Sequence, residues 1–164
     1  MLREKINSIY RPDFRLSETI FLNADGLYWH SSACRQDKYC HFNLRKEFED
    51  CGLRIFQFWE NEIYKKQHIV KSIVNNSLGE IKNKIWARKC QIKIVPHKEA
   101  KRFLEENHMM GSTTAKHIGL CFENQLISIM SYKQRGKVCK IERFCSAINH
   151  SVVGGFSKLL NHIE

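Results

Sequence analysis

The pattern of apolar and polar positions predicts alternating strands and helices in the first half of the chain. Two apolar runs predict strands, one around residues 18–24 and a largely buried one around 53–59. Between them, apolar residues recur at the spacing of one buried helix face, which predicts a helix over 36–51 that ends at Gly52. A second helix is expected over 61–78.

The second half predicts a different order of elements. A strand is expected over 91–95 and a helix over 97–107, and a last helix begins after Gly154-Gly155. Between these helices the pattern predicts three strands, near 117–123, 126–132 and 138–145. The chain ends while the last helix is still apolar, so we expect the sheet to be left with little cover on its far side.

These elements divide the sequence into two parts. Residues 1–80 predict an α/β fold, a mixed sheet flanked by helices. The run 81–90 is basic and only weakly periodic, and we interpret it as a hinge. Residues 91–164 predict a smaller α+β part, which looks incomplete.

Composition and charge narrow the class of protein. The chain has 164 residues and a formal net charge of +10, and it contains no apolar run near the roughly 18 residues of a membrane span. The N-terminal residues lack the apolar stretch of a signal peptide, so we expect an intracellular, cytoplasmic protein. A division near Lys89 gives 16 basic and 11 acidic residues before it, and 11 and 6 after it. Such an evenly spread positive charge suits a polyanion, and a basic surface without function is the alternative.

The candidate chemistry lies in the first part. Asp13 precedes the first predicted strand and Asp25 follows it, so a hairpin turning near 17–18 would bring the two carboxylates together. Paired carboxylates bind a hard cation such as Mg²⁺, which polarises a phosphoryl oxygen and activates water. His30 is a candidate to accept a proton from that water. Glu60, at the end of the buried strand, is expected to complete the site.

Each of these residues also has a plainer interpretation. Asp13 follows a proline and can cap a turn, and Asp25 with the next glycine is a common turn dipeptide. His30 beside Trp29 can be a half-buried core histidine. Glu60 can simply begin the next helix, where an acidic side chain favours the helix dipole.

Three motifs together resemble one nuclease family. They are Arg-Pro-Asp-Phe at 11–14, Asp-Gly-Leu-Tyr-Trp-His at 25–30 and Gly-Leu-Arg-Ile-Phe-Gln-Phe-Trp-Glu at 52–60. This composite resembles the very-short-patch-repair endonucleases, a branch of the PD-(D/E)XK nucleases, and most closely the phage-borne homing endonucleases with that core. The resemblance runs through 11–79 and continues through 80–164. It implies a restriction-endonuclease-like core in a phage-encoded, Mg²⁺-dependent DNA endonuclease acting in a bacterial host.

The resemblance also implies roles for individual residues. Asp13, Asp25 and the main-chain carbonyl of Ala24 would hold the cation, and His30 would assist the water. Trp29 would pack against the site or border double-stranded DNA. Basic residues of the hinge and of the following helix are expected to contact the DNA backbone: Arg88, Lys89, Lys98, Lys101 and Arg102.

The chain departs from the family pattern at several points. Asn23 stands where many homing relatives have glutamate, and no lysine occurs at the position of Asp25. The segments before Asp13 and after Leu160 are shorter than the family predicts, so the chain looks truncated at both ends. A catalytically decayed, basic DNA-binding protein is therefore the competing hypothesis. A third is an acetyltransferase-like protein, because Gly154-Gly155 opens a helix that can face a pyrophosphate.

The cysteines allow one further hypothesis. His30, Cys34, Cys40 and His41 lie close in sequence and form a candidate structural Zn²⁺ site, although the repair endonucleases have a tighter spacing. The alternative is a pair of partly buried thiols. The later cysteines are interpreted as core residues: Cys90, Cys121, Cys139 and Cys145. The sequence gives no sign of an oligomeric state.

Overall fold

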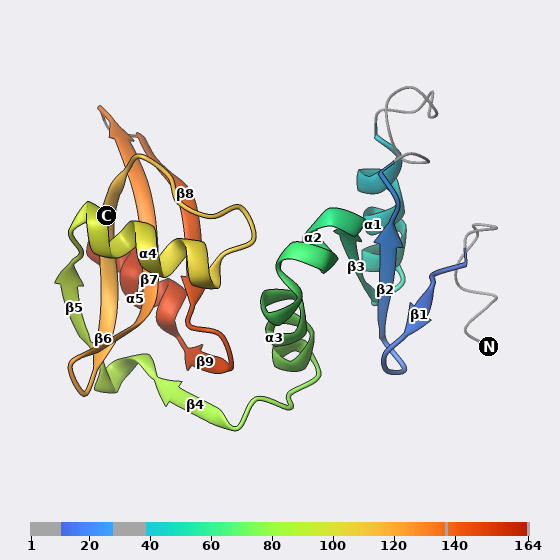
Figure 1. The fold of residues 1–164 in the computed structure, drawn as a ribbon, viewed down its shortest axis with the longest axis horizontal. Helices are drawn as coiled ribbons and strands as arrows, with labels where there is room; N and C mark the ends of the chain where they lie inside the picture. The colour runs from blue at the N-terminus through green and yellow to red at the C-terminus, as the bar shows by residue number, and fades with distance from the viewer. Residues whose placement is uncertain (1–10, 28–38, 137, 164) are drawn as a thin grey trace. The chain divides into compact units, whose positions relative to one another are not determined.

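The computed structural model describes residues 11–27, 39–136 and 138–163 (Figure 1). The chain forms two compact units, Met1–Gln67 and His68–Glu164. Both units combine strands and helices, so the prediction of a mixed α/β protein is confirmed. Among the residues described, no helix is both long and apolar enough to cross a membrane.

The N-terminal unit is built on a three-stranded sheet with the order β1-β2-β3 (Figure 1). Strand β1 (Phe14–Arg15) pairs antiparallel with β2 (Ile20–Asp25), and β2 pairs parallel with β3 (Arg54–Trp59). Helix α1 (Cys40–Asp50) comes between β2 and β3 in the chain, as a parallel connection requires. The short helix α2 (Glu60–Lys65) follows β3 directly.

Helix α1 packs on this sheet through a small aromatic and aliphatic core. Phe48 of α1 is completely buried, and its ring meets that of Phe21 on β2 edge to face, with centroids 5.4 Å apart. Leu53 and Ile55 complete the buried cluster. The helix ends where the sequence predicts, because Gly52 adopts a φ of 71° that a residue with a side chain rarely takes.

The C-terminal unit contains a four-stranded antiparallel sheet with the order β5-β6-β7-β8. Its strands confirm the four predicted here: β5 (Gln91–Ile94), β6 (Lys116–Phe122), β7 (Gln125–Arg135) and β8 (Val138–Ser146). Helices α4 (His97–Asn107) and α5 (Gly155–Ile163) are also as expected, within two residues.

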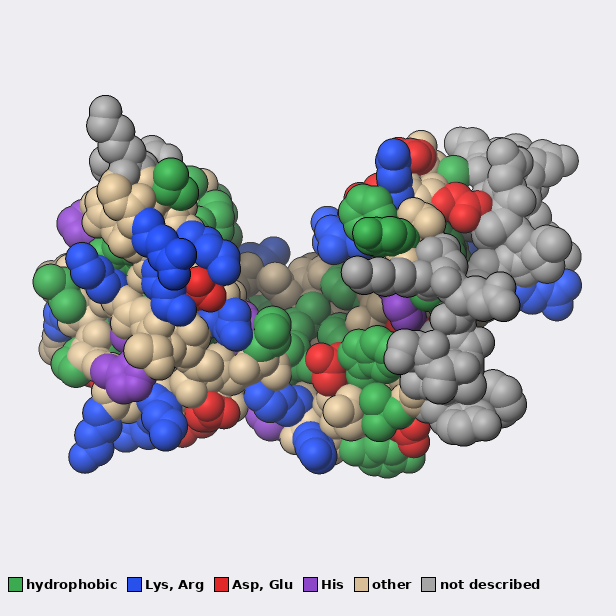
Figure 2. Space-filling view, turned by 90° about the horizontal axis from the view of Figure 1, so that it is seen from above, with side chains coloured by type: hydrophobic (Ala, Val, Ile, Leu, Met, Phe, Trp, Pro, Cys, Tyr) green, Lys and Arg blue, Asp and Glu red, His purple; other side chains and the backbone are tan. Residues whose placement is uncertain are grey.

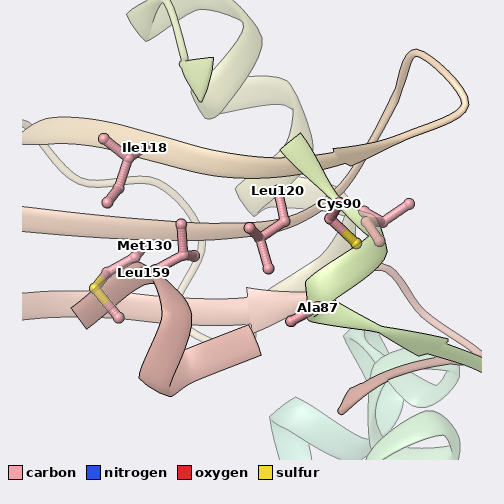
Figure 3. Close-up of a cluster of buried hydrophobic side chains, with 7 residues drawn as sticks. Ala87, Cys90, Ile118, Leu120, Met130 and Leu159 are labelled. Carbon is pink, nitrogen blue, oxygen red and sulfur yellow. The ribbon is translucent and has the colours of Figure 1, made fainter. Parts of the chain in front are cut away.

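Helices α4 and α5 cover opposite faces of this sheet. Met130 on β7 belongs to the cluster that contains Leu159 of α5, with Ile118 and Leu120 (Figure 3). Ile129, the preceding residue of β7, belongs instead to the cluster formed with α4. Successive residues of a strand point to opposite faces. The expectation of a sheet left bare on its far side is therefore wrong.

The residues expected to form a hinge are part of the C-terminal unit. Strand β4 (Asn83–Trp86) pairs parallel with β9 (His150–Val153), and the 3-10 helix η1 (Ala87–Lys89) follows it. Ala87 and Cys90 are buried in the same cluster as Leu159 (Figure 3). Neither β4 nor β9 was predicted. Because each strand is only four residues long and its partner is distant in sequence, the local pattern carries no sign of the pairing.

The predicted helix over 61–78 is two helices that belong to different units. Helix α2 ends at Lys65, and α3 (Gln67–Ser77) begins after it. The hydroxyl of Ser72 on α3 accepts a hydrogen bond of 2.8 Å from the main-chain N–H of Asn149 in the C-terminal unit. The structural boundary at Gln67 therefore lies thirteen residues before the predicted boundary at 80, because α3 packs with the C-terminal unit.

Candidate active site

A tight hairpin holds Asp13 against the end of β2. Strands β1 and β2 pair Phe14 with Leu22, and the turn is closed by hydrogen bonds to the carbonyl of Ile20 and the hydroxyl of Ser17. This is the turn near 17–18 that the sequence predicts. The carboxylate Oδ2 of Asp13 accepts a hydrogen bond of 2.8 Å from the main-chain N–H of Ala24. Asp13 therefore lies beside the residue that precedes Asp25.

Asp25 ends strand β2 at the carboxyl edge of the parallel pair. Its Cα partner on β3 is Trp59, so Glu60, the next residue, begins α2 at the same edge. Asp25 is only 3% exposed, whereas Asp13 and Glu60 are exposed. Glu62, two residues later, uses its carboxylate to accept the main-chain N–H of Trp59 at 2.9 Å and thereby caps α2.

A histidine that sequence reasoning did not assign to this site lies against Asp25. Nδ1 of His41, on the first turn of α1, is 3.4 Å from Oδ2 of Asp25 and 3.1 Å from Nε2 of Gln57. Its ring lies 5.3 Å from that of Trp59. The signal for His41 is its position, because a helix that follows a strand of a parallel pair begins at the carboxyl edge of the sheet.

Asn23 is part of the structural support of this site. It is completely buried, and its Oδ1 accepts a hydrogen bond of 3.3 Å from the main-chain N–H of Asp13. The amide oxygen of Asn23 thereby fixes the backbone of Asp13 without adding a negative charge. The hairpin therefore has two links at its open end, Asp13 to Asn23 and Ala24 to Asp13.

Two residues predicted for the site, Trp29 and His30, lie outside the described residues, as does Cys34 of the proposed zinc cluster. The remaining two members of that cluster, Cys40 and His41, are consecutive on α1. His41 directs Nδ1 towards Asp25 and Gln57. The zinc hypothesis therefore remains a prediction.

The oxygen atoms near the carboxyl edge of the sheet are of the chemical types that bind a hard cation. Asp13 and Asp25 supply carboxylates and Ala24 a main-chain carbonyl, the donor types that Mg²⁺ takes from proteins alongside water and phosphate. Both carboxylates also contact neighbouring groups, Ala24 and His41, which would orient them. In the described part of the chain, no group of three or more His, Cys, Asp or Glu side chains is arranged to hold a metal.

The five basic residues predicted to contact DNA all lie in the C-terminal unit and are exposed: Arg88 and Lys89 on η1, and Lys98, Lys101 and Arg102 on α4.

The structural boundary also changes the charge distribution between the two parts of the chain. The unit Met1–Gln67 has 11 basic and 10 acidic residues, whereas His68–Glu164 has 16 and 7. Among the charged side chains on the face of the C-terminal unit seen in Figure 2, Lys and Arg are more prominent than Asp and Glu. The net charge of the chain therefore resides almost entirely in that unit.

Comparisons of the chain with models of protein families, with characterised proteins and with solved structures found no match. The site and the surface charge of the chain therefore carry the information about its function.

Proposed function

We propose that this protein is a metal-dependent DNA endonuclease whose N-terminal unit, with a restriction-endonuclease-like core, hydrolyses phosphodiester bonds. The observation that best supports this is the position of Asp25 at the carboxyl edge of β2, with His41 against its carboxylate, while Asp13 accepts the main-chain N–H of the preceding residue, Ala24. Ligands and substrates of open α/β sheets bind at this edge. The excess of basic residues in the C-terminal unit supports a polyanionic substrate.

Each residue has a defined task in this proposal. Asp13, Asp25 and the Ala24 carbonyl would hold a Mg²⁺ ion, which when bound would supply charge stabilisation at the phosphate and a water of lowered pKa. His30 takes the proton of the attacking water as the new oxygen–phosphorus bond forms and the bond to the leaving oxygen breaks. His41 is a positioning residue that acts through Asp25, and Glu60 adds negative charge at the rim of the site.

A nicking assay on supercoiled DNA with and without Mg²⁺ tests the proposal. Asp13→Asn and Asp25→Asn are expected to abolish Mg²⁺-dependent nicking, because the amide no longer binds the cation as a carboxylate does. Glu18→Gln is the matched control: it makes the same chemical change at an exposed residue of the hairpin turn, and it is expected to leave nicking unchanged. Equal nicking by the wild type and both aspartate variants would show a contaminating nuclease and overturn the proposal.

A decayed, non-catalytic DNA-binding protein is the second candidate, and one observation favours it. Asn23, where many homing relatives have glutamate, is completely buried and bonded within the hairpin, so it holds structure and adds no negative charge. Calorimetric titration with Mg²⁺ separates the two candidates. Binding that depends on Asp13 supports the endonuclease. DNA binding that weakens steeply with salt, without Mg²⁺ binding, supports the decayed protein.

A further inference from the structure

The segment from β4 to η1 carries an unusual surface. Between residues 82 and 89 the sequence contains four basic residues and no acidic one. The exposed residues that define this β4–η1 surface are Lys82, Lys84, Trp86, Arg88 and Lys89. A large aromatic side chain at the centre of a run of cations is rare on a surface whose only task is solubility.

The pairing of β4 with β9 fixes which side chains of this segment face outwards. Ile85 and Val152 are Cα partners, and both pack against the core of the C-terminal unit. Because side chains alternate along a strand, Lys84 and Trp86 lie on the opposite face. Trp86 remains 49% exposed, and its partner Val153 is 37% exposed.

A cation already lies over the ring of this tryptophan. The guanidinium carbon of Arg88 lies 5.2 Å from the centre of the Trp86 ring. An arginine held in this way extends a flat surface and adds positive charge to it. A ligand that has both a planar ring and a negative charge can therefore contact the Trp86 ring and the Arg88 guanidinium at the same time.

Trp86 lines a groove whose backbone is held in place by hydrogen bonds from Lys158. The groove has a volume of about 560 Å³ and is lined by Trp86, Ala87, Arg88, Val153, Gly154 and Lys158. The ammonium group of Lys158 donates hydrogen bonds to the carbonyls of Ala87 at 2.9 Å and Cys90 at 2.6 Å. Ala87 is also buried in the same hydrophobic cluster as Leu159 of α5 (Figure 3). Helix α5 therefore holds η1 both by hydrogen bonds from Lys158 and by apolar packing.

We infer that the β4–η1 surface binds single-stranded nucleic acid, with a base stacked at Trp86 and the backbone along the neighbouring lysines. Single-stranded nucleic acid presents both phosphates and accessible base faces, the two features that this surface complements. A duplex hides its base faces, and the carboxylates of an acidic peptide carry no flat ring that could be placed on the tryptophan. This binding does not depend on the proposed nuclease activity.

Binding of fluorescein-labelled oligonucleotides of twelve thymidines or twelve uridines to the full chain, in EDTA, tests the inference by anisotropy. Trp86→Ala is expected to weaken binding roughly tenfold, the usual effect of removing one stacking residue, and Trp86→Phe to restore most of it. An abasic oligonucleotide of equal charge is expected to bind the wild type as weakly as the normal oligonucleotide binds Trp86→Ala. Preference for the deoxyribose or ribose strand identifies the source of the ligand.

Lys84→Gln and Lys89→Gln are expected each to reduce the slope of log affinity against log salt by about 0.7, as a phosphate contact on a single strand requires. Lys116→Gln, an exposed lysine of the same unit on β6, is the matched control and is expected to leave the slope unchanged. Photocrosslinking with a bromouracil strand is expected to label Trp86. Equal affinities of wild type and Trp86→Ala, adducts only at other residues, or preference for a duplex regardless of Trp86 would overturn the inference.

Discussion

Nδ1 of His41 lies 3.4 Å from Oδ2 of Asp25, and the two residues belong to consecutive elements of one strand–helix–strand unit. Strand β2 delivers the carboxylate to the edge of the sheet, and α1 begins at that edge with the imidazole. Asp25 is nearly inaccessible to solvent, so His41 and neighbouring groups control its orientation. This relationship makes His41 the natural residue with which to probe the proposed metal site.

His41→Gln is expected to weaken activation by Mg²⁺ roughly 10- to 100-fold, which is the usual effect of removing a group that orients a ligand. The measurement is the Mg²⁺ concentration that gives half-maximal nicking, together with calorimetric Mg²⁺ binding. His68→Gln changes an exposed histidine of α3 and serves as the control. If His41→Gln leaves Mg²⁺ binding unchanged, the contact with Asp25 has no role in positioning a ligand.

The C-terminal unit is expected to lose stability as the pH falls below about 6.5, the ordinary pKa of histidine. His117 is 4% exposed, with Nδ1 2.8 Å from the Ser131 hydroxyl and Nε2 3.2 Å from Nδ1 of His97. Burial, and secondly the neighbouring His97, lower the pKa of His117. The unfolded chain therefore binds a proton at a pH where the folded chain does not, so stability rises with pH in this window.

Melting temperatures between pH 5 and 7.5 test this expectation. His117→Gln removes the titrating group while it keeps a polar side chain, so its melting temperature is expected to fall less between pH 7 and 5.5 than that of the wild type. His162→Gln, at an exposed histidine of α5, is expected to follow the wild type. Parallel pH profiles for wild type and His117→Gln would contradict the assignment.

The sequence predicts the fold well where the periodic pattern is long and local. Helix α4 and the strands of the antiparallel sheet have uninterrupted apolar patterns, and their bounds are close to those expected, as is the end of α1. The pairing of β4 with β9 places Asn83 opposite His150, and the sequence of neither four-residue strand indicates that the other is its partner. The sequence also does not indicate the break between α2 and α3 near Lys66, because the apolar pattern continues through it. The two helices nevertheless pack in different units.

The candidate site was predictable only in part for the same reason. The hairpin that places Asp13 beside Ala24 follows from local spacing, and the structure contains it. The contact between His41 and Asp25 joins residues 16 positions apart, so it depends on where α1 begins relative to the sheet edge. The polar chain from His97 through His117 to Ser131 likewise joins a helix to two strands, which the scattered histidines of the sequence do not indicate.

The cysteines of β8 are expected to differ strongly in reactivity. Cys139 is exposed, contrary to its interpretation as a core residue, whereas burial raises the pKa of the Cys145 thiol to about 12. Because the thiolate is the reactive form, iodoacetamide at pH 8 is expected to alkylate Cys139 within minutes and to leave Cys145 unmodified in the folded chain. Mass spectrometry of tryptic peptides measures both. Labelling in denaturant is the control, and equal rates in the folded protein would contradict the protection of the Cys145 thiol by the fold.

Gly119 on β6 is expected to tolerate no side chain. A Cβ at this position would collide with Leu126 Cδ1 and lie 2.9 Å from Val95 Cγ2 and 3.0 Å from the carbonyl oxygen of Ser128. Gly119→Ala should therefore lower the free energy of unfolding of the C-terminal unit by about 1–3 kcal/mol, the usual cost of overpacking, measured by urea denaturation.

A double-mutant cycle separates this steric cause from a change in the unfolded chain. Leu126→Ala removes the nearest of the three atoms, so Gly119→Ala is expected to cost less in the Leu126→Ala background than alone. Some cost should remain, since the carbonyl of Ser128 belongs to the paired strand β7 and cannot move aside without disturbing the β6–β7 ladder. Strict additivity of the two substitutions would mean that the added methyl group does not meet Leu126, and that the close packing of β6 against this side chain is not the reason for glycine at position 119.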